Sequence, residues 1–458
     1  MNNDNLIKKV AQSPAIALEK TISTSQQVTQ KIVDNGPIKT AKNFWNGLGP
    51  GVVTGASDDD PAGIATYSQT GAQYGFQLLW LSAFTFPLMA VIQEMCARIG
   101  MVTGRGLASN IRNHFPKWLI YITALLLLLA NSFNIGANLG AMARVTQLLR
   151  PELNFAVMVV IFTVLTLLLQ IFLPYQKYAQ YLKYLALVLL TYIITAFIIK
   201  DFDWGLVLRS AVTPSFNFTR EQIFLICAIL GTTISPYLFF WQTSQEIEEK
   251  ILEGQTTIKL REDAVDNKQI GKMRTDVWSG MFFSNLVMFF IIAVCAVTLY
   301  SAGITNIETA ADAAAALKPL AGENAALLFA LGIVGTGMLA IPVLAGSASY
   351  AVSEVFGWKE GLYLHLKNAY AFYGVIMIAM LVGLGMNFVG IPPIKALIYS
   401  AVLNGLIAPI ILIPIVLISS NKKIMGERAN HPFTAIIGWI TVILMVLAGV
   451  ATIVSFFI

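Results

Sequence analysis

The chain has 458 residues, of which 56% are hydrophobic and only 12% are charged, and its formal net charge is +5. Soluble domains carry about 25% charged residues, so this composition excludes an ordinary soluble protein. Apolar runs of about 20 residues, long enough to cross a hydrocarbon core of ~30 Å, recur along the sequence. The sequence therefore predicts an all-α integral membrane protein.

The predicted elements begin with a polar segment, residues 1–46, which we interpret as a cytosolic N-terminal tail. It lacks the short apolar stretch followed by small residues that is typical of a cleaved signal peptide. Hydropathy then predicts about eleven transmembrane helices. Their approximate bounds are 47–74, 77–100, 117–149, 153–174, 178–200, 221–247, 275–301, 325–349, 367–388, 394–419 and 432–457.

The distribution of positive charge indicates the orientation in a cell membrane. With a cytosolic N-terminus, the tail and the even-numbered loops hold 22 Lys and Arg residues, against 6 in the odd-numbered loops. The positive-inside rule then predicts a cytoplasmic N-terminus and an extracytoplasmic C-terminus. The longest polar loop, residues 248–274, is expected in the cytosol, where its mixed charges predict a solvated surface.

Two predicted helices are interrupted near their middles. The first breaks at DDDPAG, residues 58–63, and the sixth at GTTISP, residues 231–236. Proline removes a backbone donor and glycine weakens a helix, so both sites are expected to unwind. A pair of proline kinks would give the same residues without a functional meaning, but a break at mid-membrane frees backbone groups that need a polar cavity.

The positions of the two breaks predict an internal repeat. Each break falls in the first helix of a five-helix set, residues 47–200 and 221–419, and an eleventh helix follows in residues 430–458. Because five is an odd number, the second set must be inverted relative to the first. Discontinuous helices 1 and 6 in a 5+5 inverted repeat are typical of transporters whose substrate site lies at the midplane.

Three consecutive acids, Asp58, Asp59 and Asp60, stand in the first break. An ionised Asp near the bilayer centre costs about 2.5–3.5 kcal/mol on an insertion scale, so three of them need compensation. A water-filled vestibule and a cation supply it, together with unwound carbonyls and the negative end of the preceding half-helix. The break is therefore predicted to bind a positive ion.

At these residues the sequence resembles the Nramp family, the natural resistance-associated macrophage proteins. The stretch PGVVTGASDDDPAGIATYSQTGAQYG fits the family's first-helix pattern, PG(x)8DPGN followed by GAQ(F/Y)G, with Asp60 in the place of the motif aspartate. GTTISPY is similar to the sixth-helix stretch GATxMPH, and ARIGMVTGRGL also looks like family sequence. The resemblance covers roughly residues 45–455 and implies a LeuT-like fold and divalent metal transport.

The chain departs from the family pattern where the metal would bind. Gly63 replaces the asparagine of DPGN, Ser235 replaces the methionine of MPH, and Tyr237 replaces its histidine. The family's helix 3 carries acids linked to proton movement, whereas NSFNIG offers Asn131 and Asn134. A thioether favours soft metals, while a hydroxyl is a hard oxygen donor of the kind that Mg²⁺ prefers. These changes resemble the Nramp-related magnesium transporter branch.

Candidate site residues follow from the breaks and from the resemblance. Asp60 is expected to be the main metal ligand, with a helix cap as the alternative, and Asp59 either a second carboxylate or an acidic lining. The expected metal-binding residues are Asp60, Asp59, Thr232, Thr233 and Ser235. Residues expected in the vestibule or behind the ligands are Asp58, Gly63, Tyr237, Gln242, Asn285 and Asn404, of which the last three are at least as well suited to interhelical packing.

The leading functional hypothesis is import of Mg²⁺, and of Mn²⁺ as well, by alternating access without obligatory proton coupling. One alternative is proton-coupled Mn²⁺ or Fe²⁺ import, as in the main family, and a second is a sodium-coupled symporter of an organic solute on the same fold. The sequence shows no pair of a nucleophile and a base that would indicate an enzyme. The expected partners are the metal ion substrate and the lipid bilayer, with no cofactor and no nucleic acid.

Overall fold

The computed structural model describes residues 49–173, 187–199 and 202–457, and the regular elements of that part are all helical. The N-terminal tail, residues 1–46, lies outside the described residues, as does much of the fifth expected span. Eight helices, counted with their direct continuations, are long and apolar enough to cross a membrane, and those at Leu187–Ile198 and Tyr370–Met386 are shorter. The fold is therefore all-helical, while the count of about eleven and the inverted repeat stay predictions.

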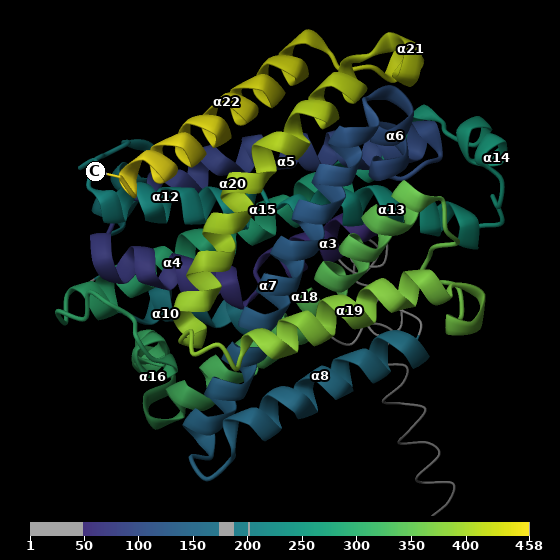
Figure 1. The fold of residues 1–458 in the computed structure, drawn as a ribbon. Coiled ribbons are helices and arrows are strands. Elements are labelled where there is room, and N and C mark those ends of the chain that lie inside the picture. The colour runs from purple at the N-terminus through teal and green to yellow at the C-terminus, as the bar shows by residue number, and fades with distance from the viewer. Residues whose placement is uncertain (1–48, 174–186, 200–201, 458) are drawn as a thin grey trace, which may run out of the picture. The chain divides into compact units, whose positions relative to one another are not determined.

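The other helices pack around the two interrupted ones (Figure 1). The longer elements are α3 (Pro50–Asp58), α4 (Pro61–Tyr74), α5 (Trp80–Thr103), α7 (Lys117–Leu149), α8 (Phe155–Phe172), α10 (Leu190–Ile198), α12 (Arg220–Thr233), α13 (Pro236–Leu252), α15 (Asn267–Cys295), α18 (Ala325–Phe356), α19 (Tyr370–Met386), α20 (Pro393–Ser420) and α22 (Pro432–Ser455). The short ones are α6 (Leu107–His114), α11 (Trp204–Val212), α14 (Ile258–Asp263), α16 (Ala310–Ala314), α17 (Lys318–Ala321) and α21 (Lys422–Met425). A π-helical segment, Ala296–Tyr300, continues α15.

The expected polar loop 248–274 is largely helical in the structure. Residues as far as Leu252 belong to α13, α14 follows, and α15 begins at Asn267. Its charges are not all solvated either, because Glu248, Lys250 and Arg261 are buried. A prediction from hydropathy ends a helix where charged residues begin. The helix itself continues as long as its backbone hydrogen bonds are made and one of its faces is buried.

The two interrupted helices lie inside the bundle, where neighbouring helices cover them. α3 packs against α15 and α13, while α4 contacts α15, α20 and α12. α7 packs against α18, α19 and α20, and α22 contacts α20 and α12 on the outer side (Figure 1). Helix breaks expose backbone polar groups, which are tolerated at membrane depth only where protein or water satisfies them.

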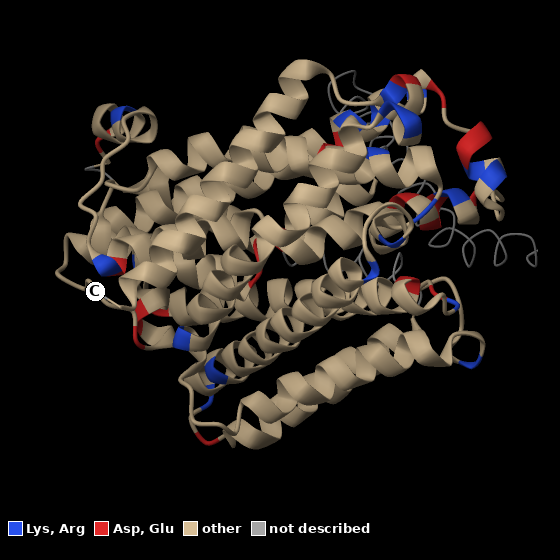
Figure 2. Cartoon of the chain, turned by 45° about the horizontal axis from the view of Figure 1, so that its top comes forward, with Lys and Arg blue, Asp and Glu red and all other residues tan. Residues whose placement is uncertain are grey.

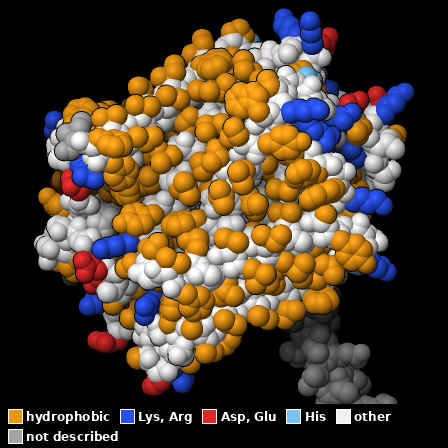
Figure 3. Space-filling model, in the orientation of Figure 1, with side chains coloured by type: hydrophobic (Ala, Val, Ile, Leu, Met, Phe, Trp, Pro, Cys, Tyr) orange, Lys and Arg blue, Asp and Glu red, His pale blue; other side chains and the backbone are white. Residues whose placement is uncertain are grey.

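Polarity in this bundle is inverted relative to a soluble protein. Only 28% of the apolar window of α8 and 33% of that of α22 are buried, and exposed leucines, valines and isoleucines cover both helices. The face seen in Figure 3 is largely hydrophobic, with charged side chains near its edges. Figure 2 shows Lys and Arg gathered at the ends of the helices. This is the surface expected of a protein surrounded by lipid.

Close contact between α3 and α15 depends on glycine. A Cβ atom on Gly280 would lie 2.2 Å from the carbonyl oxygen of Gly51, whereas one on Gly271, in the same helix, would meet nothing within 4 Å. We expect Gly280→Ala to lower the free energy of unfolding by about 1–3 kcal/mol, because overpacking displaces neighbouring atoms. Gly271→Ala is the matched control and should leave stability unchanged or slightly raised.

Thermal unfolding of the two purified variants in detergent measures this difference. Equal melting temperatures for Gly280→Ala and Gly271→Ala would contradict the close approach of α3 and α15.

Candidate metal site

The two breaks have the same cause. In each, a proline stands four residues after a residue whose carbonyl oxygen would accept a backbone N–H in an unbroken helix. Pro61 has no N–H to give to the carbonyl of Ser57, and Pro236 has none for the carbonyl of Thr232. Instead, Tyr237 Oη donates to the Ser57 oxygen over 3.1 Å, and Ser235 Oγ donates to the Thr232 oxygen over 2.6 Å. Tyr237 thus links the second break to the first.

The two breaks also touch through small side chains. A Cβ atom added to Gly63 would lie 3.3 Å both from the Asp58 carbonyl oxygen and from Thr232 Oγ1, so a larger side chain here would press on both segments. Tyr67 Oη lies 3.3 Å from Thr233 Oγ1. The expected acids and the residues around 232–236 therefore lie together, in the middle of the bundle.

The three acids of the first break are fully enclosed. Asp58, Asp59 and Asp60 are 0%, 3% and 1% exposed, so they line a closed centre, not the open vestibule expected from the sequence. Among the described residues the ion pairs join Glu94 to Arg98 and to Arg274, and no Lys or Arg pairs with these acids. Buried carboxylates without a basic partner need another source of positive charge.

Asp60 is held by donors from three positions. Its Oδ1 accepts from the Gly63 N–H over 2.9 Å, which caps the start of α4. Its Oδ2 accepts from Asn134 Nδ2 and Asn138 Nδ2 over 3.2 and 3.1 Å. Asp60 is therefore a helix cap, as the alternative interpretation had it, and its orientation is fixed by α7. Each oxygen has a second lone pair, so the cap does not prevent metal binding.

Asp58 and Asp59 share a donor on α15. Ser284 Oγ lies 2.6 Å from Asp58 Oδ2 and 3.4 Å from Asp59 Oδ1. Asp58 Oδ1 is buried without a hydrogen-bond partner, and so is Asn138 Oδ1. Two orphaned acceptors beside Asp60 indicate that something rich in positive charge or in hydrogen-bond donors belongs here. A metal ion or its bound water has this character.

Sequence reasoning missed Asn138, Ser284 and Tyr67. A signal for Asn138 was present, because it follows Asn134 by four residues and so lies on the same face of α7. No comparable signal marks Ser284, whose position depends on how α15 packs against α3. Asn131, which the sequence suggested, instead donates to the Leu344 carbonyl and to Ser347 of α18.

Two of the residues expected in the vestibule or behind the ligands show no hydrogen bond to the acids. Asn285 accepts from Thr85 of α5 over 3.0 Å and donates to the Met281 carbonyl, so it joins α15 to α5. Asn404 is buried in α20, and its Oδ1 has no hydrogen-bond partner. The packing role allowed for these asparagines fits Asn285.

Gln242 of α13 links neighbouring helices on one side of the acids. Thr54 Oγ1 on α3 donates to Gln242 Oε1 over 2.6 Å, and Gln242 Nε2 donates to Glu246 Oε1 over 2.8 Å. Asp276 Oδ2 accepts from the Gly51 N–H over 2.6 Å, at the start of α3. These bonds tie α3 to α13 and α15.

The donor set suits a hard cation bound through few direct ligands. Among the described residues no group of three or more His, Cys, Asp and Glu side chains is arranged to hold a metal ion. The centre therefore offers carboxylates together with carbonyl, hydroxyl and amide oxygens. Mg²⁺ usually keeps several waters and takes one or two carboxylates, which is compatible with such a centre.

Comparison with known proteins identifies relatives over nearly the whole chain. Residues 51–455 match the profile of the family described as natural resistance-associated macrophage protein-like. The chain is 27% identical over 425 residues to the divalent metal cation transporter MntH of Klebsiella pneumoniae strain 342, covering 92% of this chain and 96% of that one.

Solved structures show a similar fold at lower sequence identity. A crystal structure of the Eremococcus coleocola manganese transporter with an aromatic bis-isothiourea compound aligns with a TM-score of 0.69 at 18% identity, covering 90% of this chain and 86% of that one. Mhp1, a nucleobase-cation-symport-1 family transporter, in a closed conformation with bromovinylhydantoin bound, aligns with a TM-score of 0.53 at 15% identity, covering 89% and 91%.

The bonds to Asp60 generate a prediction. Asn138→Ala should weaken Mn²⁺ binding roughly tenfold or more, because it removes a group that orients the carboxylate and an orphaned oxygen beside it. Asn285→Ala is the matched control, a buried asparagine on another helix whose bonds go to α5, and it should leave affinity unchanged. Isothermal calorimetry with the purified full-length protein measures both, and equal losses would argue against a metal at Asp60.

Proposed function

Because the chain belongs to the natural resistance-associated macrophage protein (Nramp) family, we propose that it carries divalent metal cations across a membrane by alternating access. The observation that carries this proposal is the enclosure of Asp58, Asp59 and Asp60 against a second helix break, without a basic partner. The relatives named as transporters fit this role and fit the expectation that the chain is not an enzyme. A doubly charged ion offsets the cost of the buried carboxylates.

The proposed ligands are oxygen atoms from both breaks. Asp60 and Asp59 supply carboxylates, Thr232 and Thr233 supply backbone carbonyls at the end of α12, and Ser235 contacts a bound water. Asp58 and Asn138 add their orphaned oxygens. The Ser235 hydroxyl donates hydrogen bonds to the carbonyls of Gly231 and Thr232, so its lone pairs stay available to the ion or its waters.

We propose Mg²⁺ as the transported ion, with Mn²⁺ as a second substrate. All the proposed ligand atoms are hard oxygens, and Ser235 has a smaller side chain than the methionine of the family pattern. Magnesium releases its water reluctantly, so a centre that keeps part of the hydration shell favours it. None of the proposed ligand atoms is a sulfur that would favour a transition metal over the more abundant magnesium.

We propose that transport does not require the coupled movement of protons. The helix 3 positions that face Asp60 are Asn134 and Asn138, neither of which takes up or releases a proton in the physiological range. Entry of the ion from the extracytoplasmic side and release to the cytoplasm follow from the proposed orientation, with the N-terminus inside. Release then requires α3 to part from Gln242 and Asp276.

Proton-coupled import of Mn²⁺ or Fe²⁺ is the second candidate. It is favoured by the names of the relatives, a divalent metal cation transporter and a manganese transporter. The amides at Asn134 and Asn138 and the hydroxyl at Ser235 argue against it. A sodium-coupled symporter of an organic solute, which the fold also allows, is disfavoured because three acids would repel a substrate carboxylate.

Flux measurements in proteoliposomes test the proposal directly. Inward Mg²⁺ gradients should drive uptake of Mg²⁺ by the wild type with no accompanying proton movement. Asp60→Ala should abolish that uptake because it removes the carboxylate that both asparagines orient. A fixed ratio of protons to metal would refute the uncoupled mechanism, and undiminished uptake by Asp60→Ala would refute the site.

Ion preference should follow the residue at position 235. Ser235→Met places a thioether where the hydroxyl now lies, so competition by Mn²⁺ or Cd²⁺ for Mg²⁺ uptake should rise by about tenfold or more. Ser235→Ala is the control for loss of the hydroxyl alone and should gain no soft-metal preference. An unchanged ion preference in a stably folded Ser235→Met protein would place residue 235 away from the ion.

A further inference from the structure

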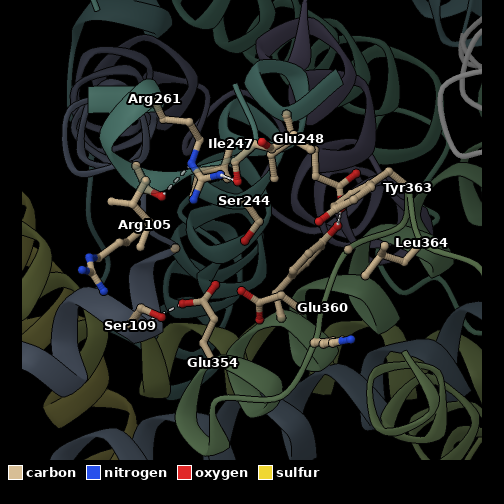
Figure 4. Close-up of a pocket in the computed structure, with 18 residues that line it drawn as sticks. Arg105, Ser109, Ser244, Ile247, Glu248, Arg261, Glu354, Glu360, Tyr363 and Leu364 are labelled. Atoms are coloured by element: carbon tan, nitrogen blue, oxygen red, sulfur yellow. Dashed lines mark hydrogen bonds between the residues drawn. The ribbon is translucent and has the colours of Figure 1, made fainter. Parts of the chain in front are cut away.

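A cavity lined by charged and polar side chains lies at one end of the bundle, apart from the two helix breaks. It has a volume of about 500 Å³ and is lined by residues of α6, α13, α14 and the end of α18, together with the loop that follows α18 (Figure 4). On α13, Ser244 in the cavity wall follows Ser235 by nine residues, so a rise of 1.5 Å per residue separates them by about 13 Å. The cavity is therefore distinct from the central acids.

Three glutamates line this cavity, and two of them have structural partners. Glu248 accepts hydrogen bonds from Tyr350 Oη and from the Leu362 N–H. Glu354 accepts from the Ser109 N–H over 2.6 Å, in the first turn of α6. Glu360 differs from both, because its Oε2 is buried without a hydrogen-bond partner.

A serine adds a second, independent sign of a missing ligand. Ser244 is only 3% exposed, and its Oγ has no hydrogen-bond partner. Figure 4 shows its hydroxyl directed into the space between the carboxylates of Glu354 and Glu360. A buried hydroxyl costs free energy unless it is hydrogen-bonded, so its orientation toward two acids calls for an occupant between them.

Two basic residues of the cavity wall, Arg261 and Arg105, form no ion pair with these acids. Arg261 Nε donates to the Gly104 carbonyl over 3.0 Å, and its Nη1 donates to the Thr256 carbonyl over 3.1 Å. Arg105 is directed away from the carboxylates (Figure 4). Among the described residues no ion pair includes Glu354 or Glu360.

Glu360 interacts electrostatically with two other carboxylates, those of Glu354 and Glu248, and Arg112 is the basic residue that opposes them.

We propose that this cavity is a second divalent-cation site, in which Glu354, Glu360 and Ser244 face the ion or its bound waters. One or two carboxylates and several waters are the usual surroundings of Mg²⁺. Six waters at about 30 Å³ each occupy about 180 Å³, which a cavity of about 500 Å³ accommodates. The site does not depend on the proposed transport function, because none of its residues contacts the central acids.

An ion here would join elements that lie far apart in the sequence. Ser244 belongs to α13, the second half of an interrupted helix, whereas Glu354 is bonded to α6 and Glu360 lies in the loop after α18. In the proposed orientation this end faces the cytoplasm. The second site then senses the divalent cation on the side where the transported ion is released.

Mn²⁺ titration followed by electron paramagnetic resonance tests the proposal, using the full-length protein in detergent. Asp60→Asn serves as the background, since it removes binding at the central site. This variant should still bind one Mn²⁺, and adding Glu360→Gln should weaken that remaining site about tenfold or more, because it loses a charged ligand. Glu262→Gln, an exposed glutamate of α14 outside the cavity, is the matched control and should change nothing.

The outcomes separate this site from the central one. If Asp60→Asn leaves two bound ions while Glu360→Gln removes one, the second site stands and the central assignment fails. If Asp60→Asn binds no Mn²⁺, or if Glu360→Gln and Ser244→Ala both leave its binding unchanged, the second site is refuted. Thermal unfolding of the Glu360→Gln and Ser244→Ala proteins verifies that each variant is folded.

Discussion

The centre of this protein depends on two prolines that deprive carbonyls of their helical donors. Inside a bilayer a backbone oxygen without a partner costs several kcal/mol, and water is not available to repair the loss. The Ser57 carbonyl accepts a hydrogen bond from Tyr237, and the Thr232 carbonyl accepts one from Ser235. Both donors therefore lie in the second break or directly after it. The same geometry that interrupts the helices therefore holds the two interruptions together.

Three acids are tolerated at this junction because the surrounding helices supply donors to them. Asn134 and Asn138 of α7 hold Asp60, while Ser284 of α15 holds Asp58 and approaches Asp59. These bonds do not neutralise charge, and oxygens of Asp58 and Asn138 stay without partners. The proposed cation would supply the positive charge and occupy these acceptors. Thr54 and the Gly51 N–H tie α3 to Gln242 and Asp276, and the proposed transport cycle requires these contacts to open.

The sequence predicted the parts of the fold that follow from local chemistry. Apolar length located most of the spans, and proline and glycine located both breaks. What it could not predict depends on packing between distant helices. Ser284 reaches the acids only because α15 lies against α3 through glycine, and Asn285, the next residue, faces α5 instead. Charge in residues 248–274 indicated a loop, yet Arg261 and Glu248 are buried by tertiary contacts that hydropathy does not contain.

Anomalous X-ray diffraction from crystals of the full-length protein grown with Mn²⁺ tests the central claim most directly. We expect an anomalous peak between the Asp58–Asp60 segment and the Thr232–Ser235 segment, within coordination or water-bridged distance of Asp60. A fully occupied ion elsewhere in the membrane-spanning region, with no anomalous density at this junction, would contradict the assignment of the buried acids as the transport site.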